Sequence, residues 1–320
     1  MTVKSVSSNV IAEGVVLLKN GECVVIPTET VYGLAADTTN GKAVAKIFDI
    51  KGRPTFNPLI SHFHNVSHLS EYIELNEFLK KLSTAFWPGP MTLIVNRKQG
   101  CKISDMTTAG LDTIAVRIPS HPTAQKIIKA AGVPLAAPSA NRSGEVSPTS
   151  ATHVAHSLGD KAPLIIADGS CTIGLESTVI DVTGDVPIVL RPGAITTEQI
   201  SEALGCEIVI DLGDKGDDVK SPGQLLKHYA PNTPVRLKAF DIHDDEVLLA
   251  FGSTKFMPVD NAVQVLNLSE SGDLFEAASN LFDYLRRLDM TGAKSIAVMD
   301  IPKNGIGLAI NDRLKRASEG

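Results

Sequence analysis

Two short polar clusters near the N-terminus contain residues that could bind or activate a small molecule. They are Thr28-Glu-Thr-Val-Tyr-Gly33 and Lys51-Gly-Arg53, and the second leads on to Asn57 and His62. A glycine between two cations lets the backbone approach an anion while both side chains reach it. Considered alone, the first segment is also compatible with a capped turn and the second with a solvated charged loop.

Two further clusters combine small polar groups with arginines. Ser139-Ala-Asn141 continues to Ser147, and Ser177-Thr-Val-Ile-Asp181 is followed by Arg191-Pro-Gly193. Arg117 ends an apolar stretch, where an arginine without a partner is costly to bury. A serine-rich turn and a structural ion pair are the alternative interpretations of these features.

The composition restricts the class of ligand. The chain has 320 residues, of which 43% are hydrophobic and 21% charged, as expected for a globular protein of two domains. Its net charge of −6 argues against a broad nucleic-acid-binding surface. An anionic ligand must therefore be held by a few focused cations, which favours a small-molecule cavity. Standard nucleotide motifs are absent, so any ATP is bound in another way.

The cysteines and the apolar segments give no sign of a zinc site, a redox motif or a membrane span. Cys23, Cys101, Cys171 and Cys206 lie far apart and form no C-x-x-C pair. The N-terminus lacks an apolar run typical of a signal sequence, and no stretch approaches the ~18 apolar residues of a membrane span. We therefore expect reduced thiols, a cytoplasmic location and no membrane partner.

Alternating strand and helix patterns must position the four polar clusters. A helix capped by Thr39 or Asn40 follows the first cluster. Strands are predicted at residues 22–26, 91–95, 113–118, 133–137 and 179–182, and helices at residues 78–86 and 122–131. The clusters lie in turns or just after strands, where open α/β sheets bind ligands. The pattern predicts an α/β fold with a twisted open sheet.

A second pattern begins at Val235 and predicts a small parallel sheet. Asp273 opens a helix with one apolar stripe. Strands are predicted at residues 235–237, 247–251, 263–266 and 295–299. This order is Rossmann-like in outline, but it lacks G-x-G-x-x-G, so no dinucleotide is expected.

Together the four clusters resemble the YrdC-like threonylcarbamoyl-AMP synthases. The segment Ser221-Pro-Gly-Gln-Leu-Leu-Lys-His-Tyr-Ala-Pro231 is similar to the linker of the long, two-domain form. The resemblance covers essentially the whole chain and implies a YrdC-like catalytic domain at residues 1–206. A linker or lid at residues 207–234 and a small Rossmann-like domain at residues 235–320 complete the expected organisation.

The resemblance implies a nucleotidyltransferase that condenses L-threonine, bicarbonate and ATP into threonylcarbamoyl-AMP and pyrophosphate. The product would serve N6-threonylcarbamoyladenosine formation in tRNA, through a downstream threonylcarbamoyl-transferase complex. Such phosphoryl chemistry depends on positioning and charge stabilisation, so no protein nucleophile is needed. Mg²⁺ is expected with the ATP, but no carboxylate cluster identifies protein ligands for it.

The resemblance also implies residue roles by motif position. Lys51 and Arg53 would be catalytic, and Ala137 stands where a residue such as threonine is expected, so a hydroxyl contact is lost there. Threonine would be bound by Thr30, His62, Arg117 and Ser177. ATP would be bound by Arg53, Asn57, Thr113, Ser139, Asn141, Ser147, Arg191 and Tyr229.

Two other functions are compatible with a YrdC-like module. A carbamoyl-adenylate enzyme of hydrogenase maturation would carry paired C-x-x-C motifs, which this sequence lacks. A non-catalytic double-stranded-RNA-binding protein would use the same concave face but would not need the ATP and threonine positions. Leu225, Leu226 and Tyr229 make the linker more apolar than a tether, so we expect a lid, with plain domain packing as the alternative.

Overall fold

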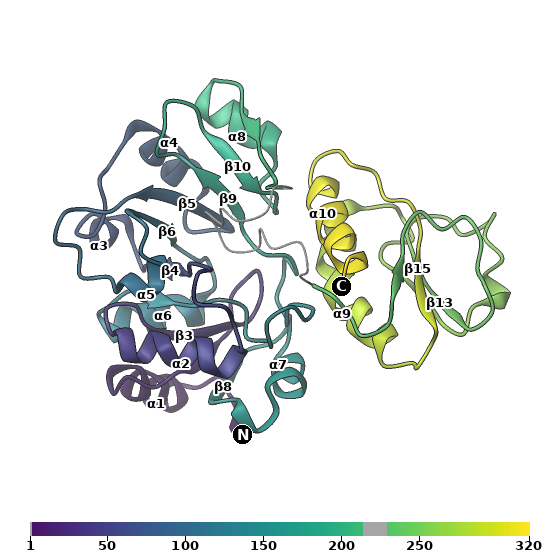
Figure 1. Ribbon diagram of the computed structural model, residues 1–320, viewed down its shortest axis with the longest axis horizontal. Helices are drawn as coiled ribbons and strands as arrows, with labels where there is room; N and C mark the ends of the chain where they lie inside the picture. The colour runs from purple at the N-terminus through teal and green to yellow at the C-terminus, as the bar shows by residue number, and fades with distance from the viewer. Residues whose placement is uncertain (1, 214–228) are drawn as a thin grey trace.

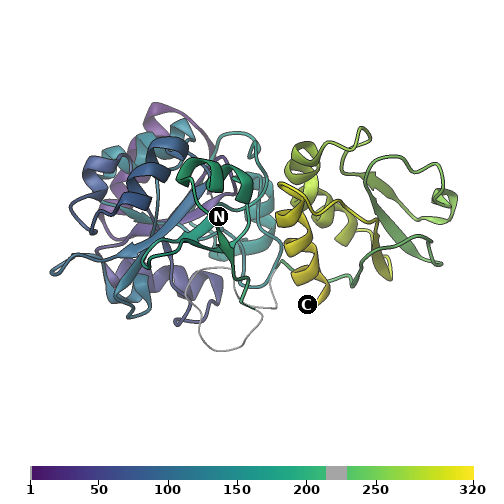
Figure 2. The same cartoon turned by 90° about the horizontal axis from the view of Figure 1, so that it is seen from above.

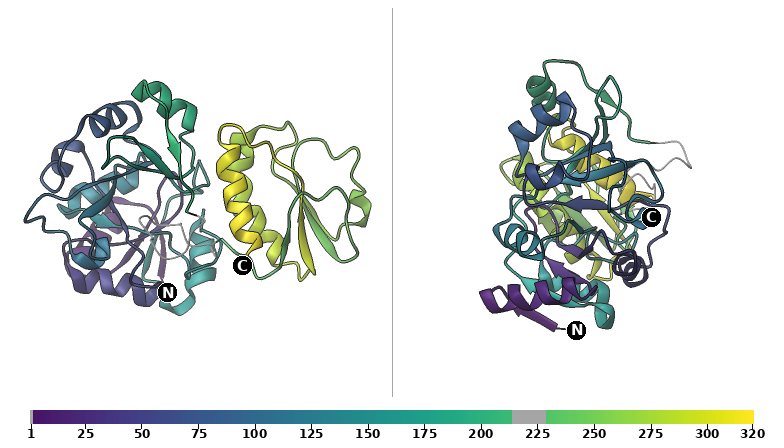
Figure 3. Two further views of the ribbon diagram at one scale, coloured as in Figure 1. Left: turned by 45° about the horizontal axis from the view of Figure 1, so that its top comes forward. Right: turned by 90° about the vertical axis from the view of Figure 1, so that its left-hand side faces the viewer.

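The structure is a computed structural model that describes residues 2–213 and 229–320. The N-terminal part contains a mixed eleven-stranded sheet in the order β1-β8-β2-β3-β7-β4-β6-β5-β9-β10-β11. The C-terminal part contains a four-stranded sheet in the order β12-β15-β13-β14. The two parts lie side by side, and helices α9 and α10 face the N-terminal part (Figure 1). The views from above and at other angles show the same arrangement (Figures 2 and 3).

The sheet strands of the N-terminal part are short, and most are connected by helices. The strands are β1 (Thr2–Ser5), β2 (Val24–Ile26), β3 (Gly33–Asp37), β4 (Ile60–His62), β5 (Met91–Asn96), β6 (Thr113–Arg117), β7 (Leu135–Ala136), β8 (Leu164–Ala167), β9 (Thr178–Asp181), β10 (Ile188–Arg191) and β11 (Val209–Ile210). The helices are α1 (Ser8–Lys19), α2 (Gly41–Lys51), α3 (Val66–Leu69), α4 (Glu77–Phe86), α5 (Asp105–Thr108), α6 (Pro122–Ala131), α7 (Ala151–Leu158) and α8 (Thr197–Leu204), with a 3₁₀ turn η1 (Gly159–Lys161).

The strands and helices predicted for this part are confirmed, with ends shifted by at most two residues. Asn40, rather than Thr39, caps α2 by accepting hydrogen bonds from the amides of Lys42 and Ala43. Gly52 ends the same helix in the left-handed conformation, with φ 60°. This turn places Lys51 and Arg53 on either side of the helix end, next to the middle of the sheet.

Helices cover the large sheet unevenly, and this leaves room for a site. Helices α1 and α6 pack on one face of β8, β2, β3 and β7, and α2 and α7 pack on the other. Further along the sheet, α4 and α8 cover one face of β5, β6 and β9. The opposite face there carries a small cluster to which, among the described residues, no helix contributes: Ile60, Ile94, Ala115, Val179 and Leu190.

The C-terminal part has the parallel sheet that the sequence predicted. Its strands are β12 (Val235–Arg236), β13 (Glu246–Ala250), β14 (Val265–Asn267) and β15 (Ser295–Val298), and every pair is parallel. Helices α9 (Leu274–Asp289) and α10 (Gly307–Ser318) cover one face, while loops and the 3₁₀ turn η2 (Val259–Asn261) cover the other. Asp273 caps α9 through the amides of Phe275 and Glu276.

The two parts share one hydrophobic cluster. Val31, Leu175 and Tyr229 pack with the buried apolar residues of α9 and α10. Gly174 lies so close to α9 that a Cβ there would fall 2.6 Å from the backbone of Ser279. The C-terminal part therefore forms a wall next to the open face of the large sheet. None of the described helices is long and apolar enough to span a bilayer.

Candidate active site

The turn after β2 is fixed by its own hydroxyl groups. Thr28 Oγ1 accepts hydrogen bonds from the amides of Thr30 and Val31, both at 3.2 Å, and donates to the Val31 carbonyl at 2.6 Å. This is the local pattern by which threonine stabilises a turn. The turn holds Glu29 and Thr30 at the open face of the sheet, where both are buried.

Arg117 is the centre of this end of the site. It ends β6 and is 4% exposed, and its Nη1 donates to Thr30 Oγ1 at 2.9 Å. Its Nη2 forms an ion pair with Glu29 Oε1 at 2.6 Å. Burial alone would raise the pKa of Glu29, but the Arg117 charge and its hydrogen bonds lower it below the ordinary value. Arg117 thus has the structural ion pair foreseen as an alternative, and it lines the pocket as well.

His62 lies opposite Arg117 in the register of β4 and β6. Burial, together with the charge of Arg117, lowers the pKa of His62 to about 3. The ring is therefore neutral near pH 7. Its Nδ1 lies 3.2 Å from the Ile60 carbonyl, which requires the proton on Nδ1 for a hydrogen bond. In that tautomer Nε2 is an acceptor, and the residue lines the pocket.

Ser177 and Arg191 form the adjoining wall. Arg191, at the end of β10, donates from Nη2 to the carbonyl of Ser177 at 2.9 Å and to its Oγ at 3.1 Å. The same Oγ lies 2.7 Å from Thr92 Oγ1, on the neighbouring strand β5. Burial lowers the pKa of Arg191, but a guanidinium stays charged under ordinary conditions. The hydroxyl of Ser177 is thus held between a cation and a second hydroxyl.

The two cations at the end of α2 have different environments. Lys51 Nζ donates to the carbonyls of Ser139 at 2.5 Å and Asn141 at 2.6 Å, and burial lowers its pKa well below the ordinary value. Lys51 does not line the pocket. Its ammonium instead holds the loop at residues 139–141 through these two carbonyl contacts. Arg53 does line the pocket. Its Nε and Nη2 donate to the Asn57 and Pro58 carbonyls, and burial lowers its pKa to about 10.

Ser139 lines the pocket, whereas Asn57, Thr113, Asn141 and Ser147, which were also predicted to bind ATP, do not line it. Asn57 Oδ1 is buried without a hydrogen-bond partner among the described residues. Ser147 Oγ donates to Glu176 Oε1 at 2.5 Å. Thr113 lies at the start of β6 on the same face as Arg117, about 13 Å away at the usual rise per strand residue. A ligand that reached both would have to be extended.

Three residues of the site were not predicted from the sequence. Glu29 lies within the Thr28–Gly33 motif, but its partner Arg117 is far away in the chain, so no local sequence feature identified it. Glu176 lines the pocket, and burial alone would raise its pKa, but Arg313 and Arg191 lower it. Arg313 Nε donates to Glu176 Oε2 at 3.0 Å from α10, 137 positions away, and no local sequence feature indicates that contact.

Tyr229 connects the pocket to the C-terminal part. It lines the pocket and is fully buried, with a left-handed φ of 62°. Its ring stacks on Phe282 of α9 with centroids 5.5 Å apart, and the Arg313 guanidinium lies 5.1 Å from its centroid. Of the predicted lid at residues 221–231, most residues, with Leu225 and Leu226, lie outside the described part of the chain.

The space between these walls is about 50 Å³ and is lined by Arg53, Arg117 and Arg191 together with His62, Ser177 and Glu176. Within the described ranges, no group of three or more His, Cys, Asp or Glu residues is placed to hold a metal ion. The fold and the site define a two-domain α/β protein with a small, arginine-lined pocket suited to anions. The pocket is suited to positioning and charge stabilisation rather than to attack by a protein nucleophile.

Comparisons with known proteins agree with this class. Residues 16–193 match the Sua5, YciO and YrdC family, described as telomere recombination, and residues 195–319 match the family described as threonylcarbamoyl-AMP synthase, C-terminal domain. The chain is 39% identical to a threonylcarbamoyl-AMP synthase of Bacillus subtilis, over 97% of this chain and 93% of the relative. A relative of that name from Pyrococcus abyssi is also 39% identical, over 94% and 92%.

A solved structure agrees with the whole fold. The crystal structure of P. abyssi Sua5 complexed with L-threonine matches with a TM-score of 0.90 and 36% identity, over 99% of this chain and 96% of that chain. The chain therefore belongs to the threonylcarbamoyl-AMP synthase family, in its two-domain form. The YrdC-like fold of the N-terminal part and the Rossmann-like C-terminal part, both expected from the sequence, are confirmed.

Proposed function

We propose that this chain condenses L-threonine, bicarbonate and ATP into threonylcarbamoyl-AMP and pyrophosphate. The observation that carries the proposal is the presence of Arg53, Arg117 and Arg191 in one pocket with a neutral His62. The reaction must bring a triphosphate, a carboxylate and bicarbonate together, and three guanidinium groups offset their mutual repulsion. Membership of an ATP-using synthase family supports the same reaction.

The Arg117 end of the pocket suits threonine. Guanidinium groups bind carboxylates with two parallel hydrogen bonds, and Glu29 holds Arg117 in a fixed orientation for that contact. Thr30, Ser177 and the acceptor Nε2 of His62 provide partners for the amine and the side-chain hydroxyl. The L-threonine complex of the P. abyssi relative supports this assignment.

The Arg53 and Arg191 end suits ATP. Arg53 Nη1 has no hydrogen-bond partner among the described residues, so it can donate to a phosphate oxygen. The buried Asn57 Oδ1 can accept from an N–H group of the base. Ser139, Asn141, Ser147 and Thr113 remain proposed ATP-binding residues. Because Lys51 binds the carbonyls of Ser139 and Asn141, we propose that it contributes to catalysis by holding the loop that carries these two residues.

The chemistry follows from these positions. Bicarbonate releases hydroxide to give carbon dioxide, and the neutral amine of threonine attacks its carbon. The proton that the nitrogen loses combines with the hydroxide to form water, which leaves a carbamate. A carbamate oxygen then bonds to the α-phosphorus while the bond to pyrophosphate breaks, and Arg53 and Arg191 stabilise the charge that develops. With a pKa of about 3, His62 is a poor general base at neutral pH, so it acts as a hydrogen-bond acceptor. We propose that Mg²⁺ arrives with ATP, held by phosphate oxygens.

The pocket must open before ATP can bind. A space of about 50 Å³ is far below the ~300–1,000 Å³ of usual ligand pockets. Tyr229 is the pocket-lining residue that comes from the segment connecting the two sheets, and we propose that this segment moves to admit ATP. In this proposal residues 1–206 are the catalytic domain, residues 207–234 the connecting lid and residues 235–320 the C-terminal domain. Exclusion of water would then protect the carbamate and the adenylate.

We further propose that the adenylate is passed to a threonylcarbamoyl-transferase complex that modifies tRNA in the cytoplasm. An acyl adenylate is a mixed anhydride that water hydrolyses, so a consuming reaction must follow promptly. Pyrophosphate release tests the proposed synthesis, because it should require threonine, bicarbonate and ATP together. Equal release without threonine would show simple ATP hydrolysis and overturn the proposal.

A further inference from the structure

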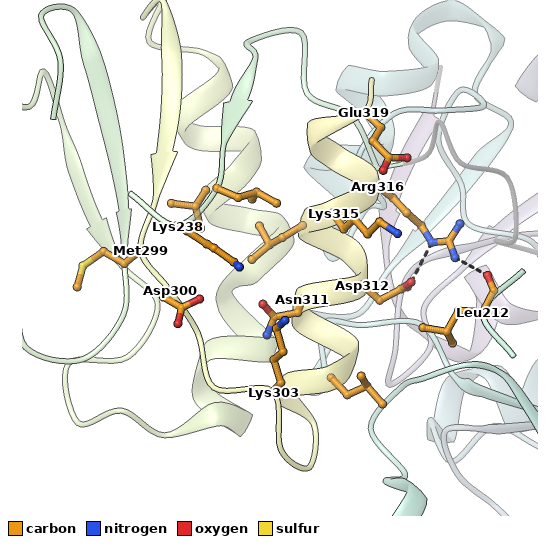
Figure 4. Close-up of a pocket in the computed structure, with 14 residues that line it drawn as sticks. Leu212, Lys238, Met299, Asp300, Lys303, Asn311, Asp312, Lys315, Arg316 and Glu319 are labelled. Atoms are coloured by element: carbon orange, nitrogen blue, oxygen red, sulfur yellow. Dashed lines mark hydrogen bonds and ion pairs between the residues drawn. The ribbon is translucent and has the colours of Figure 1, made fainter. Parts of the chain in front are cut away.

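A second and larger cavity lies in the C-terminal domain. It has a volume of about 330 Å³, within the usual range for small-molecule sites. It opens next to the carboxyl ends of β12 and β15, which are adjacent parallel strands, and α10 forms its other side (Figure 4). Open parallel sheets commonly bind ligands at that edge. Part of its lining is apolar, from Leu237, Val298 and Leu314.

Several polar groups converge on this cavity. Lys238, Asp300 and Asn311 point toward one another across the space between the strand ends and α10 (Figure 4). Asn311 Nδ2 donates to the carbonyls of Ile301 and Gly307, which fixes the amide and leaves Oδ1 as an acceptor. The side chains of Lys238 and Lys303 have no hydrogen-bond or ion-pair partner among the described residues.

The backbone at Lys238 is strained in a way that favours a functional role. Lys238 has a φ of 55°, in the left-handed region that residues other than glycine rarely adopt. The next amide, of Ala239, donates to the Val298 carbonyl at 2.8 Å and ties the turn to β15. Such strain persists where the surroundings impose it, and it is concentrated at ligand sites. Here it places a lysine at the mouth of the cavity.

We propose that this cavity binds a nucleoside monophosphate. Lys238 and Lys303 supply two positive charges for a phosphate, and Asp300 with Asn311 Oδ1 accepts from ribose hydroxyls. The apolar side of the cavity, at Leu237 and Leu314, suits the face of a base. One small molecule fits the volume, whereas a dinucleotide would exceed it and would need the glycine-rich turn that this domain lacks.

A chain of buried contacts connects this cavity to the active site. Asp312 lines the cavity, and its Oδ2 accepts from Arg313 Nη1 at 2.6 Å. Arg313 in turn donates to Glu176, which lines the first pocket. A ligand that orders α10 would therefore affect Glu176, in the wall of the first pocket, through Asp312 and Arg313. The proposal concerns a second site and does not rest on the reaction proposed for the first.

Calorimetric titration of the full chain with AMP tests the proposal. The Arg53→Ala background weakens AMP binding at the active site, so binding that remains reports the second site. Adding Lys238→Glu and Lys303→Glu should weaken AMP binding by about tenfold or more, because both phosphate contacts are lost. Lys255→Glu, a lysine of the same domain outside the cavity, is the matched control and should change nothing.

Adenosine and inorganic phosphate serve as partial ligands and should each bind more weakly than AMP. Hydrogen–deuterium exchange locates the site. AMP should slow exchange in α10 of the Arg53→Ala protein, but not in the protein that also carries Lys238→Glu and Lys303→Glu. Equal AMP affinity with and without the two lysine substitutions would overturn the proposal. So would AMP protection confined to the first pocket.

Discussion

Arg313 and Glu176 form a buried ion pair between the two domains, with Nε and Oε2 3.0 Å apart. Arg313 is fully buried, and its Nη2 also donates to the Pro192 carbonyl at 3.0 Å. Burial alone would lower the pKa of Arg313, but nearby Tyr229 and Glu176 raise it. The C-terminal domain thus contributes a charged group directly behind Glu176, which lines the candidate active-site pocket.

We expect Arg313→Ala to weaken both the docking of the C-terminal domain and the binding of ATP. Removing one partner of a buried ion pair typically costs about 3–5 kcal/mol, because the other charge is left unpaired. Urea denaturation and the KM for ATP measure the two effects. Adding Glu176→Gln should recover part of the lost stability. Arg287→Ala, which removes an exposed pair with Asp283, should cost less than about 1 kcal/mol. A wild-type KM and stability in Arg313→Ala would contradict the assigned role.

We expect Arg117→Ala to reduce threonine affinity about 10- to 100-fold, the value of one charge-assisted contact. Calorimetry with threonine measures the change. Because Arg117 also pairs with Glu29, Arg117→Ala combined with Glu29→Gln should be better folded than Arg117→Ala alone and just as weak in binding. Threonine binding at wild-type strength in either variant would remove Arg117 from the site.

His62 should make stability depend on pH. Its pKa is about 3 in the folded protein, against about 6.5 when unfolded. Between these values the unfolded state binds the extra proton. The free energy of unfolding therefore falls as pH decreases from about 6.5, by up to about 1.4 kcal/mol per pH unit. We expect the free energy of unfolding, measured by urea denaturation, to fall less between pH 7 and pH 5 in His62→Gln than in wild type.

An identical drop in His62→Gln and wild type would mean that His62 is not buried in its neutral form.

Substrate discrimination should follow the polar lining of the threonine end. Valine would leave buried partners of the hydroxyl unpaired, among them Thr30, His62 and Ser177, a penalty that can reach about 10⁴-fold. Serine keeps the hydroxyl and loses one methyl group, worth about 1–3 kcal/mol. Ratios of kcat/KM for the three amino acids measure this order. Comparable turnover of valine and threonine would refute the assigned pocket.

Local sequence patterns were sufficient for several elements around the site, but not for β4, which carries His62, or β10, which carries Arg191. Residues 122–131 were predicted as a helix, and α6 has those bounds because His121 caps it and Gly132 ends it at φ 76°. The predicted strands β5, β6 and β9 are among the most buried, so their apolar runs were unambiguous.

Contacts between distant segments could not be predicted in this way. The ion pair of Arg117 with Glu29 and that of Arg313 with Glu176 depend on how segments far apart in the chain meet. The environment of Lys51 was also hidden, because a lysine that binds backbone carbonyls has the same sequence context as one that binds phosphate. Only the packing of α2 against the loop at residues 139–141 shows which of these two roles Lys51 has.

Incorporation of labelled bicarbonate tests the central claim most directly. The protein is incubated with ¹⁴C-bicarbonate, L-threonine and ATP, and the adenylate fraction is separated and counted. We expect one label per pyrophosphate released, with no label when threonine is omitted or replaced by valine, and a large loss in Arg117→Ala. Pyrophosphate release without label in the adenylate, or label that appears without threonine, would contradict the account.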